Sequence, residues 1–441
     1  MALSPELTGF VALAVLFIAI FIGFPIVFTV IAVGLVFGYL ALDTVVLHLM
    51  VLQVFSVMRD PTLASVPFFL FMGYLLEQAG LVERLFRGVQ LMLATVRGSL
   101  YLAVLVTATI FAAATGIVGS SVTLLGVMAA PAMKRSGYDV RMSAGTIAAG
   151  GTLGILIPPS VMLIVMGPVV GVPTTDLFAA AVVPGLLLAG LYIVYVLVRS
   201  HLNPALGPAL PPEERADSLR EVAKELVLGI APVMVVIFAT LGVILAGIAT
   251  PTDAGACGAG AVLALTLIYR RLSWEKLRSA VFSTLQVSSM ILVLVAASNF
   301  FGAVFSRLGS AHWIAESLAG LQFSPTVMLV LMLVIIFVLG WPLEWVPIVL
   351  IVVPIFLPLA RELGIDLVWF STLVAVCLQT AWLSPPVALS AYFLKGVVPD
   401  WELKDIYMGM LQFMALQVAG LALLLAFPQL ALWLPRVLNA E

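Results

Sequence analysis

Long apolar stretches make up most of the chain, and short polar segments separate them. A helix needs about 20 apolar residues to cross the hydrocarbon core of a membrane. Runs close to this length occur at residues 7–23, 25–41, 62–79, 143–168, 177–198, 226–249, 254–269, 280–306, 367–394 and 406–434. The pattern predicts an all-α protein that crosses a membrane many times. Composition agrees, because 10% of the residues are charged, whereas soluble domains carry about 25%.

Two of these runs contain a double proline. The pair is Pro158–Pro159 in the run at 143–168 and Pro385–Pro386 in the run at 367–394. Proline lacks the N–H that a helix requires, and its ring clashes with the preceding turn. Each run is therefore predicted to be a discontinuous helix. Within a membrane, such breaks are tolerated only where protein or a water-filled cavity surrounds them, and secondary transporters bind ions and anions there.

Two further apolar runs, 99–133 and 323–360, each hold two arms around an irregular centre. The centre of the first is Ala114–Ser121, and that of the second is Gly340–Glu344. We predict that both runs are re-entrant hairpins. Two full spans joined by a tight turn are the alternative that the pattern leaves open.

The two halves of the chain repeat. Pro131, Gly137, Asp139 and both prolines of the first break recur 227 residues later, beside matching hydropathy features. A polar, Pro-rich linker at 199–225 separates five spans on each side, so we expect a first repeat at 1–198, this cytoplasmic linker, and a second repeat at 226–441. An odd number of spans turns the second repeat upside down, which predicts inverted topology.

Basic residues set the expected orientation. If both hairpins return to their side of entry, 16 of the 20 Lys and Arg residues fall on one side, and the positive-inside rule makes that side cytoplasmic. Both termini then face outward. Segments 43–58 and 80–98 are amphipathic and are expected to lie in the lipid interface, more as a brace than as a lipid sensor.

Five hydroxyl residues, one tryptophan and one glutamate at the irregular centres are the candidates for substrate binding. They comprise Ser120, Ser121 and Thr123 in the first hairpin, Thr152 and Thr380 beside the two breaks, and Trp341 and Glu344 in the second hairpin. Hydroxyl groups also pack membrane helices against one another, which is the structural alternative. Together with Ser160, Ser384 and unwound backbone carbonyls, these residues offer the oxygen ligands that Na⁺ prefers.

Three other polar positions have competing interpretations. Glu344 is a functional candidate because carboxylates inside membranes are costly, but it could equally cap the returning helical arm. Trp341 could form a gate or simply pack. Asp253 is better explained as a helix-start residue, and Asn299 as an interhelical hydrogen-bonding group.

Several classes of function are excluded. Two cysteines and three scattered histidines form neither a disulfide framework nor a metal cluster. The sequence has no catalytic triad and no phosphate-binding loop, which argues against an enzyme and against an ATP-driven pump. No basic patch suggests nucleic acid, and no basic segment precedes the first apolar run as in a cleaved signal peptide.

Four stretches resemble the large membrane subunit (M subunit) of tripartite ATP-independent periplasmic (TRAP) transporters. They are Ala114–Thr123, Gly151–Ser160, Ala249–Gly255 and Leu383–Val387. The resemblance covers essentially the whole chain, and the stretch GILIPPS is highly specific. The second hairpin, at 343–354, together with 379–386, resembles the branch labelled mannitol/chloroaromatic, which also includes 2-oxo acid systems.

The resemblance implies a Na⁺-coupled importer of organic acids in a bacterial inner membrane, working by an elevator motion. A periplasmic binding protein (P subunit) would deliver the substrate, and a small four-helix Q subunit would brace the scaffold as a separate polypeptide. A stand-alone ion-coupled anion carrier and a non-transporting scaffold remain alternatives.

The family's Na⁺ sites can be carried over residue by residue. One site falls on Gly340, Ala381, Ser384 and Val387, largely through backbone oxygens. The pseudo-symmetric site falls on Ser120, Gly154 and Ser160. Ala381 and Ser384 stand where the family often has Gly and Thr, so backbone ligation is expected to persist while side-chain ligation differs.

Overall fold

The computed structural model describes residues 4–439 apart from 117, 217, 321 and 386. The described residues are helical, with no β-strand among them. The first half contains α1 (Pro5–Ile22), α2 (Ile26–Leu42), α3 (Val45–Arg59), α4 (Ser65–Gln78), α5 (Leu81–Met92), α6 (Ser99–Thr115), α7 (Val118–Arg135), α8 (Val140–Thr152), η1 (Leu153–Ile155), α9 (Val161–Val170) and α10 (Thr174–Leu202).

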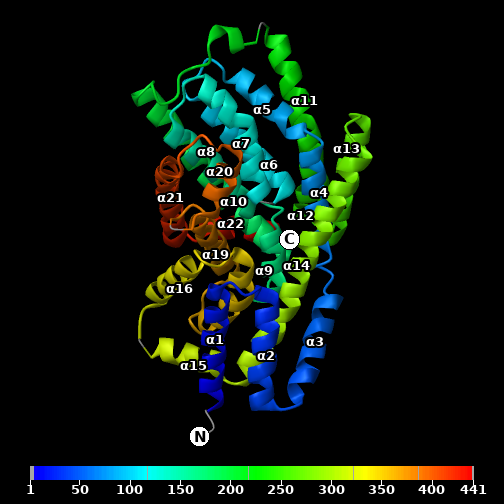
Figure 1. The fold of residues 1–441 in the computed structure, drawn as a ribbon, viewed down its shortest axis with the longest axis vertical. Helices are drawn as coiled ribbons and strands as arrows, with labels where there is room; N and C mark the ends of the chain where they lie inside the picture. The colour runs from blue at the N-terminus through cyan, green and yellow to red at the C-terminus, as the bar shows by residue number, and fades with distance from the viewer. Residues whose placement is uncertain (1–3, 117, 217, 321, 386, 440–441) are drawn as a thin grey trace.

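The second half continues after a short helical turn, η2 (Pro212–Glu214). Its elements are α11 (Leu219–Ile237), η3 (Phe238–Gly242), α12 (Val243–Leu245), α13 (Pro251–Ile268), α14 (Trp274–Arg307), α15 (Ser310–Ala319), α16 (Pro325–Leu339), α17 (Trp345–Pro347), η4 (Ile348–Val352), α18 (Val353–Glu362), α19 (Leu367–Ala381), α20 (Leu389–Val397), α21 (Leu403–Ala426) and α22 (Gln429–Leu438). Figure 1 shows both halves wound around a common centre, where α9 and α19 meet.

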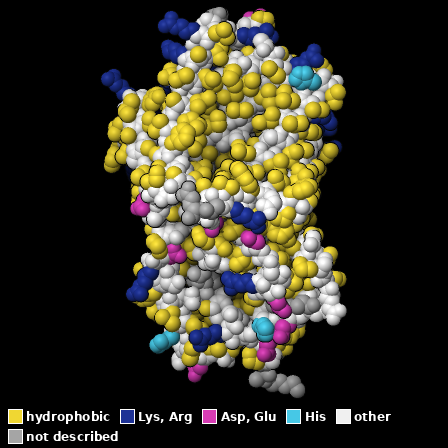
Figure 2. Space-filling view, turned by 180° about the vertical axis from the view of Figure 1, so that it is seen from behind, with side chains coloured by type: hydrophobic (Ala, Val, Ile, Leu, Met, Phe, Trp, Pro, Cys, Tyr) yellow, Lys and Arg dark blue, Asp and Glu magenta, His cyan; other side chains and the backbone are white. Residues whose placement is uncertain are grey.

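The prediction of an all-α polytopic membrane protein is confirmed. By length and composition, seven helices in the described part of the chain could cross a membrane, or eight if the bent pair α4–α5 is one span. This is fewer than the apolar runs predicted, because the two interrupted runs and the runs at 25–41 and 62–79 supply helices shorter than 18 residues. On the rear face, hydrophobic side chains form a wide area with charged side chains at its upper edge and below it (Figure 2).

Both double-proline runs are interrupted helices. In the first, α8 ends at Thr152, η1 makes one tight turn, and α9 begins only at Val161. In the second, α19 ends at Ala381 and α20 begins at Leu389. Pro386 lies outside the described residues. The prediction of two discontinuous helices is therefore confirmed.

The two irregular apolar runs form helical hairpins. In the first, α6 and α7 are joined at Gly116, whose φ of +63° favours glycine. In the second, α16 ends at Leu339 and the returning arm begins at Trp345. Each tip packs against a helix break, as described below, so each hairpin reaches only as far as the middle of a neighbouring run. This is the geometry of a re-entrant hairpin.

The two halves use the same local geometry at positions 227 residues apart. Gly137 and Gly364 both take positive φ values, +72° and +67°, where α7 and α18 end. Asp139 caps α8 by accepting a hydrogen bond from Met142 N, and Asp366 caps α19 in the same way. Helix N-termini leave backbone N–H groups unpaired, and a carboxylate satisfies them. In both halves, therefore, a glycine with positive φ ends one helix and an aspartate two residues later caps the start of the next.

Helices extend further into the polar segments than their apolar runs indicate. Helix α10 continues to Leu202 and α11 begins at Leu219, so the irregular part of the predicted linker shrinks to 203–218. Helix α14 begins at Trp274 rather than near 280. In α11 and α14, a serine N-cap (Ser218 or Ser273) starts the helix among charged residues, a signal that hydropathy alone does not carry.

The amphipathic segment at 80–98 acts as a brace. Its helix, α5, turns by 62° from α4 and buries its apolar face against protein. Gly88 approaches the backbone of α11 so closely that a Cβ there would lie 2.9 Å from Leu226 Cα. The apolar face expected to enter the lipid interface is therefore covered by α11.

A close helix crossing provides a test of this packing. A Cβ on Gly145 of α8 would lie 2.5 Å from the carbonyl oxygen of Gly409 in α21. We expect Gly145→Ala to lower the free energy of unfolding by about 1–3 kcal/mol, as overpacking does, measured by denaturant unfolding in detergent. The matched control is Gly190→Ala in α10, where the new methyl meets open space; equal stability of the two variants would contradict the crossing.

Candidate functional site

The first hairpin tip lies directly on the first helix break. A Cβ on Gly116 would lie 2.6 Å from the carbonyl oxygen of Pro159 and 3.2 Å from Ser160 Cα. Ser160 occupies the N-cap position of α9, and its hydroxyl donates a hydrogen bond to the carbonyl oxygen of Ile155. The interrupted backbone is thus satisfied in part by its own side chain and is covered by the hairpin.

The second hairpin tip meets the second break in a comparable way. A Cβ on Gly340 would lie 2.8 Å from Ala381 Cβ. The Trp341 indole Nε1–H donates to Ser384 Oγ at 3.1 Å. Ser384 N in turn donates to the carbonyl oxygen of Ala381 at 3.1 Å. Gly340, Ala381 and Ser384 are therefore close together, and Val387 follows in the same irregular segment before α20.

A cavity of about 130 Å³ lies between the two hairpins and the two breaks. We call it the central cavity. The first hairpin contributes Gly116, Val118 and Gly119; the second contributes Glu344, Trp345 and Val346; the breaks contribute Ile155 and Trp382; α4, α9 and α14 supply Leu70, Val161, Met162, Val287, Met290 and Ile291. At roughly 30 Å³ per water, its volume equals that of about four water molecules.

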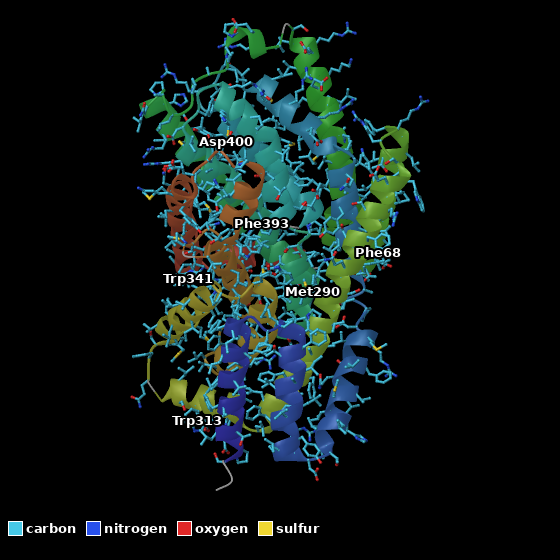
Figure 3. The ribbon with its side chains drawn as sticks, in the orientation of Figure 1. Phe68, Met290, Trp313, Trp341, Phe393 and Asp400 are labelled. Carbon is cyan, nitrogen blue, oxygen red and sulfur yellow. The ribbon has the colours of Figure 1, made fainter. Side chains whose placement is uncertain are left out.

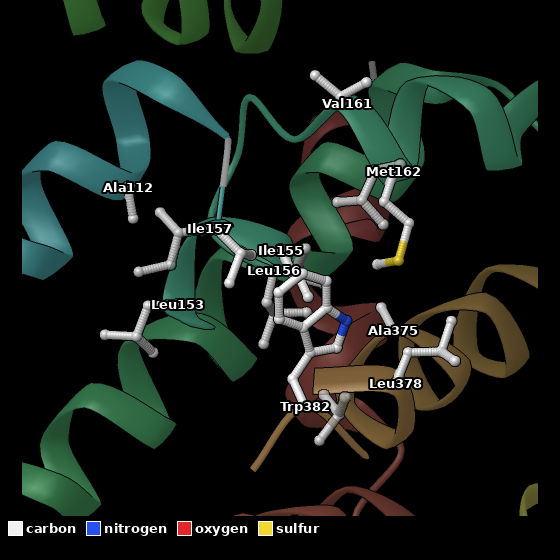
Figure 4. Packing of buried hydrophobic residues seen from close by; sticks show 14 of the residues in the cluster. Ala112, Leu153, Ile155, Leu156, Ile157, Val161, Met162, Ala375, Leu378 and Trp382 are labelled. Carbon is white, nitrogen blue, oxygen red and sulfur yellow. The ribbon is translucent and has the colours of Figure 1, made fainter. Parts of the chain in front are cut away.

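The cavity lies where equivalent residues of the two halves meet. Ile155 and Trp382, which are 227 positions apart, both line it. Figure 4 shows the Trp382 ring beside Ile155 and Leu156 of the first break. Trp382 also stacks on Phe393 of α20, with ring planes 8° apart. Met290, Trp341 and Phe393 mark this central region in Figure 3.

Glu344 is the one charged residue among those that line the described cavity. It occupies the N-cap position of α17, as the structural alternative predicts, but its side chain makes no capping hydrogen bond. Trp341 lies outside the lining and instead bonds to Ser384. The Glu344 carboxyl group therefore faces the cavity with its hydrogen-bonding capacity unused by the helix end.

None of the three hydroxyl residues of the first hairpin is among the residues that line the central cavity. Ser120 donates a hydrogen bond to the carboxylate of Glu77 in α4. Thr123 donates to the carbonyl oxygen of Gly119 at 2.9 Å, and Ser121 is buried. The backbone of the tip, rather than these side chains, reaches the cavity.

The threonines at the breaks are also buried away from the cavity. Thr380 donates to the carbonyl oxygen of Val376 within its own helix. Thr152 accepts from Gln379 Nε2 at 3.3 Å and from Gln417 Nε2 at 3.4 Å. Thr152 and Gln379 are equivalent positions of the two halves, 227 residues apart. Their contact shows that the two breaks meet at equivalent positions, as in a pseudo-twofold arrangement of the halves. Gly154 lies in η1, buried beside them.

Sequence reasoning missed Glu77, Gln379 and Gln417. Glu77 is a carboxylate inside the apolar run 62–79, which is a detectable signal for function. Gln379 precedes the second break and Gln417 lies within an apolar run, so both are amides in otherwise hydrophobic helices. Asp253 and Thr250 form the predicted helix start, since Thr250 Oγ1 accepts from Asp253 N at the head of α13.

Exposed ion pairs join the two halves at one end of the molecule. Lys134 Nζ lies 2.7 Å from Asp400 Oδ2, and Arg141 Nε lies 2.8 Å from Asp405 Oδ1. The Lys134 ammonium lowers the pKa of Asp400, first through its hydrogen bond and then through its charge. Because solvent screens such pairs, they contribute little to stability.

Comparison with solved structures shows the class of fold to which this chain belongs. Its fold is similar to that of the Alcanivorax borkumensis YdaH transporter, whose crystal structure matches with a TM-score of 0.62 over 89% of both chains at 15% sequence identity. The chain thus has the fold of a multi-pass membrane transporter. Residues 13–430 match the model of the family "Tripartite ATP-independent periplasmic transporter, DctM component". The chain belongs to this family of TRAP large permease subunits.

Curated relatives carry different transport assignments. The C4-dicarboxylate TRAP transporter large permease protein of Pseudomonas aeruginosa is 30% identical and covers 88% of this chain and 89% of its own. The sialic acid TRAP transporter large permease protein of Vibrio cholerae is 28% identical over 95% and 96% of the two chains. The 2,3-diketo-L-gulonate TRAP transporter large permease protein of Escherichia coli is 27% identical over 76% and 78%.

The polar contact between the breaks generates a prediction. In Thr152→Val, the amides of Gln379 and Gln417 lose their shared acceptor while staying buried. Leaving buried polar groups unpaired costs about 1–3 kcal/mol each, so we expect a clear fall in unfolding free energy, measured in detergent. Thr109→Val is the control, because that hydroxyl bonds only its own helix carbonyl at Leu105. A loss no larger than in the control would show that the contact contributes nothing.

Proposed function

We propose that the chain forms the transport path of a TRAP transporter that imports an organic acid together with Na⁺. One observation supports this most: each hairpin tip packs on a helix break, and both pairs border one small cavity. Transporters with inverted repeats bind substrate and coupling ions where discontinuous helices meet. The proposal extends the family assignment from the kind of subunit to its chemistry.

Na⁺ binding is assigned to the two hairpin–break junctions. At the second junction, Gly340, Ala381, Ser384 and Val387 would supply mostly backbone oxygens, and the Trp341 indole would orient the Ser384 hydroxyl. At the first junction, Ser160 and Gly154 would act, with Ser120 on the hairpin. Because the Ser120 and Ser160 hydroxyls already donate to other groups, their oxygen lone pairs remain free for a cation.

A carboxylate cargo is supported by electrostatics. The N-termini of α9 and α20 follow the two breaks, and helix N-termini present partial positive charge and free N–H groups to anions. The relatives' named substrates, C4-dicarboxylate, sialic acid and 2,3-diketo-L-gulonate, are organic acids. We therefore propose that the cargo is a small carboxylate. Among such compounds we favour the substrates of the mannitol/chloroaromatic and 2-oxo acid branch, which the second hairpin resembles.

The remaining parts of the proposal concern assembly and movement. A periplasmic binding protein would deliver the cargo, and a small Q subunit would complete the permease, as the tripartite family name implies. The protein would lie in the bacterial inner membrane with both termini periplasmic. Hairpins and broken helices would move together as an elevator relative to a scaffold that includes α11, α13 and α14.

Uptake into liposomes tests the proposal directly. With the permease complex reconstituted, we expect accumulation of a labelled C4-dicarboxylate or 2-oxo acid only under an inward Na⁺ gradient and only when the partner binding protein is present. Replacing Na⁺ by K⁺ is the control. Equal uptake by the chain alone would instead support a stand-alone carrier, and the absence of uptake with every organic acid supplied would refute the proposal.

The second junction offers a test of the ion site. We expect Ser384→Ala to raise the Na⁺ concentration for half-maximal uptake by about tenfold, since a hydrogen-bonded ligand near a charge is worth roughly 1.5–3 kcal/mol. The control is Ser371→Ala, because Ser371 bonds only its own helix carbonyl at Leu367. If the Na⁺ dependence is unchanged and only the maximal uptake falls, Ser384 is not a ligand of the ion.

A further inference from the structure

A second, polar cavity lies between the end of α4, α5 and the α13–α14 connection, with Leu124 of the first hairpin in its lining. Its volume is about 730 Å³. Its charged lining residues are Arg84 and Arg87 of α5, Arg271 and Lys276 around the α13–α14 connection, and Glu77, Glu83 and Glu225. The positive-inside rule explains why these basic residues share one side of the membrane, but it does not explain why they line a cavity together with three carboxylates.

The four basic side chains have no carboxylate partner in the described part of the chain, although three acidic residues line the same cavity. Lys276 Nζ donates to the carbonyl oxygen of Arg271 at 3.4 Å. One of those acids, Glu77, is engaged by Ser120. The lining therefore keeps a modest net positive charge, which suits an anion that must bind and leave again.

Two helices run from the central cavity to the polar one. In α4, Leu70 lines the central cavity and Glu77, two turns later on the same face, lines the polar cavity. In α7, Gly119 lines the central cavity and Leu124 lines the polar one. The hydrogen bond from Ser120 to Glu77 joins these helices at the boundary between the cavities.

We propose that the polar cavity is a vestibule that binds the anionic oxygens of the cargo as it leaves the central cavity, and that the Ser120–Glu77 hydrogen bond closes the passage between them. The inference rests on the proposed transport of a carboxylate. An ionised Glu77 at the boundary repels an anion on either side, and separation of the hairpin from α4 opens the way to Arg84 and Arg87. Carboxylate and phosphate share the chemistry that arginine recognises.

Chemical access to the central cavity tests the closure. The reporter is Val118→Cys, because Val118 lines the central cavity, in a background of Cys257→Ser and Cys377→Ala. In nanodiscs of neutral phosphatidylcholine, an anionic sulfonatoethyl methanethiosulfonate should modify it slowly. Glu77→Ala should raise that rate about tenfold, as expected for losing one charge-assisted hydrogen bond.

The matched control is Glu83→Ala, which removes the same charge from the same cavity without touching the hairpin. We expect it to raise the rate clearly less than Glu77→Ala does, because it removes one screened negative charge and leaves the Ser120–Glu77 hydrogen bond in place. If Glu77→Ala and Glu83→Ala behave alike, the Ser120–Glu77 closure is wrong. This measurement needs neither Na⁺ nor a binding protein, so it stands apart from the uptake assay.

Charge selectivity tests the vestibule. In the Glu77→Ala background, adding Arg84→Gln and Arg87→Gln should slow the anionic reagent several-fold and leave a cationic trimethylammonium reagent equal or faster. Gln substitutions at Arg135 and Arg199, which do not line the cavity, are the control. Parallel changes for both reagents would overturn the anion-binding vestibule.

A lipid arm separates the two sources of anion. The anionic reagent is compared in phosphatidylcholine nanodiscs and in nanodiscs that contain phosphatidylglycerol. Slower modification with phosphatidylglycerol, abolished by the Arg84 and Arg87 substitutions, would assign the cavity to a phospholipid headgroup and overturn the cargo vestibule. Equal rates in the two lipids support the cargo.

Discussion

Satisfying the backbone of an interrupted helix is the constraint on which this structure depends. A break inside an apolar region leaves carbonyl and N–H groups that water cannot reach freely. At the first break, Ser160 bonds Ile155 and the hairpin glycine Gly116 covers the turn. At the second, Ser384 N donates to the carbonyl oxygen of Ala381 and Ala388 N donates to that of Ser384. The Trp341 indole of the hairpin tip donates to the Ser384 hydroxyl. Each hairpin tip therefore covers one helix break. The central cavity is the space left between the two covered breaks.

The pseudo-twofold relation brings like positions together, but their chemistry differs. Thr152 meets Gln379, and Ile155 meets Trp382. Ser160 of the first break corresponds to Val387 in the second. The second junction accordingly obtains its hydroxyl from Ser384 and its hydrogen-bond donor from the hairpin tip. Equivalent backbones with different side chains give the protein one fold for both halves and two distinguishable junctions.

The sequence predicted those features that arise from local chemistry. Double prolines marked both breaks, because a proline acts on its own few residues. Contacts across the fold could not be predicted. Ser120 was selected for its place at a glycine-rich tip, yet its hydroxyl bonds Glu77, which lies 43 residues away in the chain. Hydropathy likewise placed the starts of α11 and α14 too late in the chain, because a serine N-cap starts each helix among charged residues.

On the proposed function, Glu344 explains why an anion carrier would need a cation. Its carboxyl group faces a small cavity whose other lining residues carry no charge. A carboxylate cargo in the same space would bring two like charges close together, and like charges repel. A Na⁺ bound at the Gly340–Ser384 junction, close along the chain to Glu344, would offset that repulsion. The cargo would then bind well only after the ion, and the ion would be held better once the cargo is present, which is reciprocal coupling between two sites.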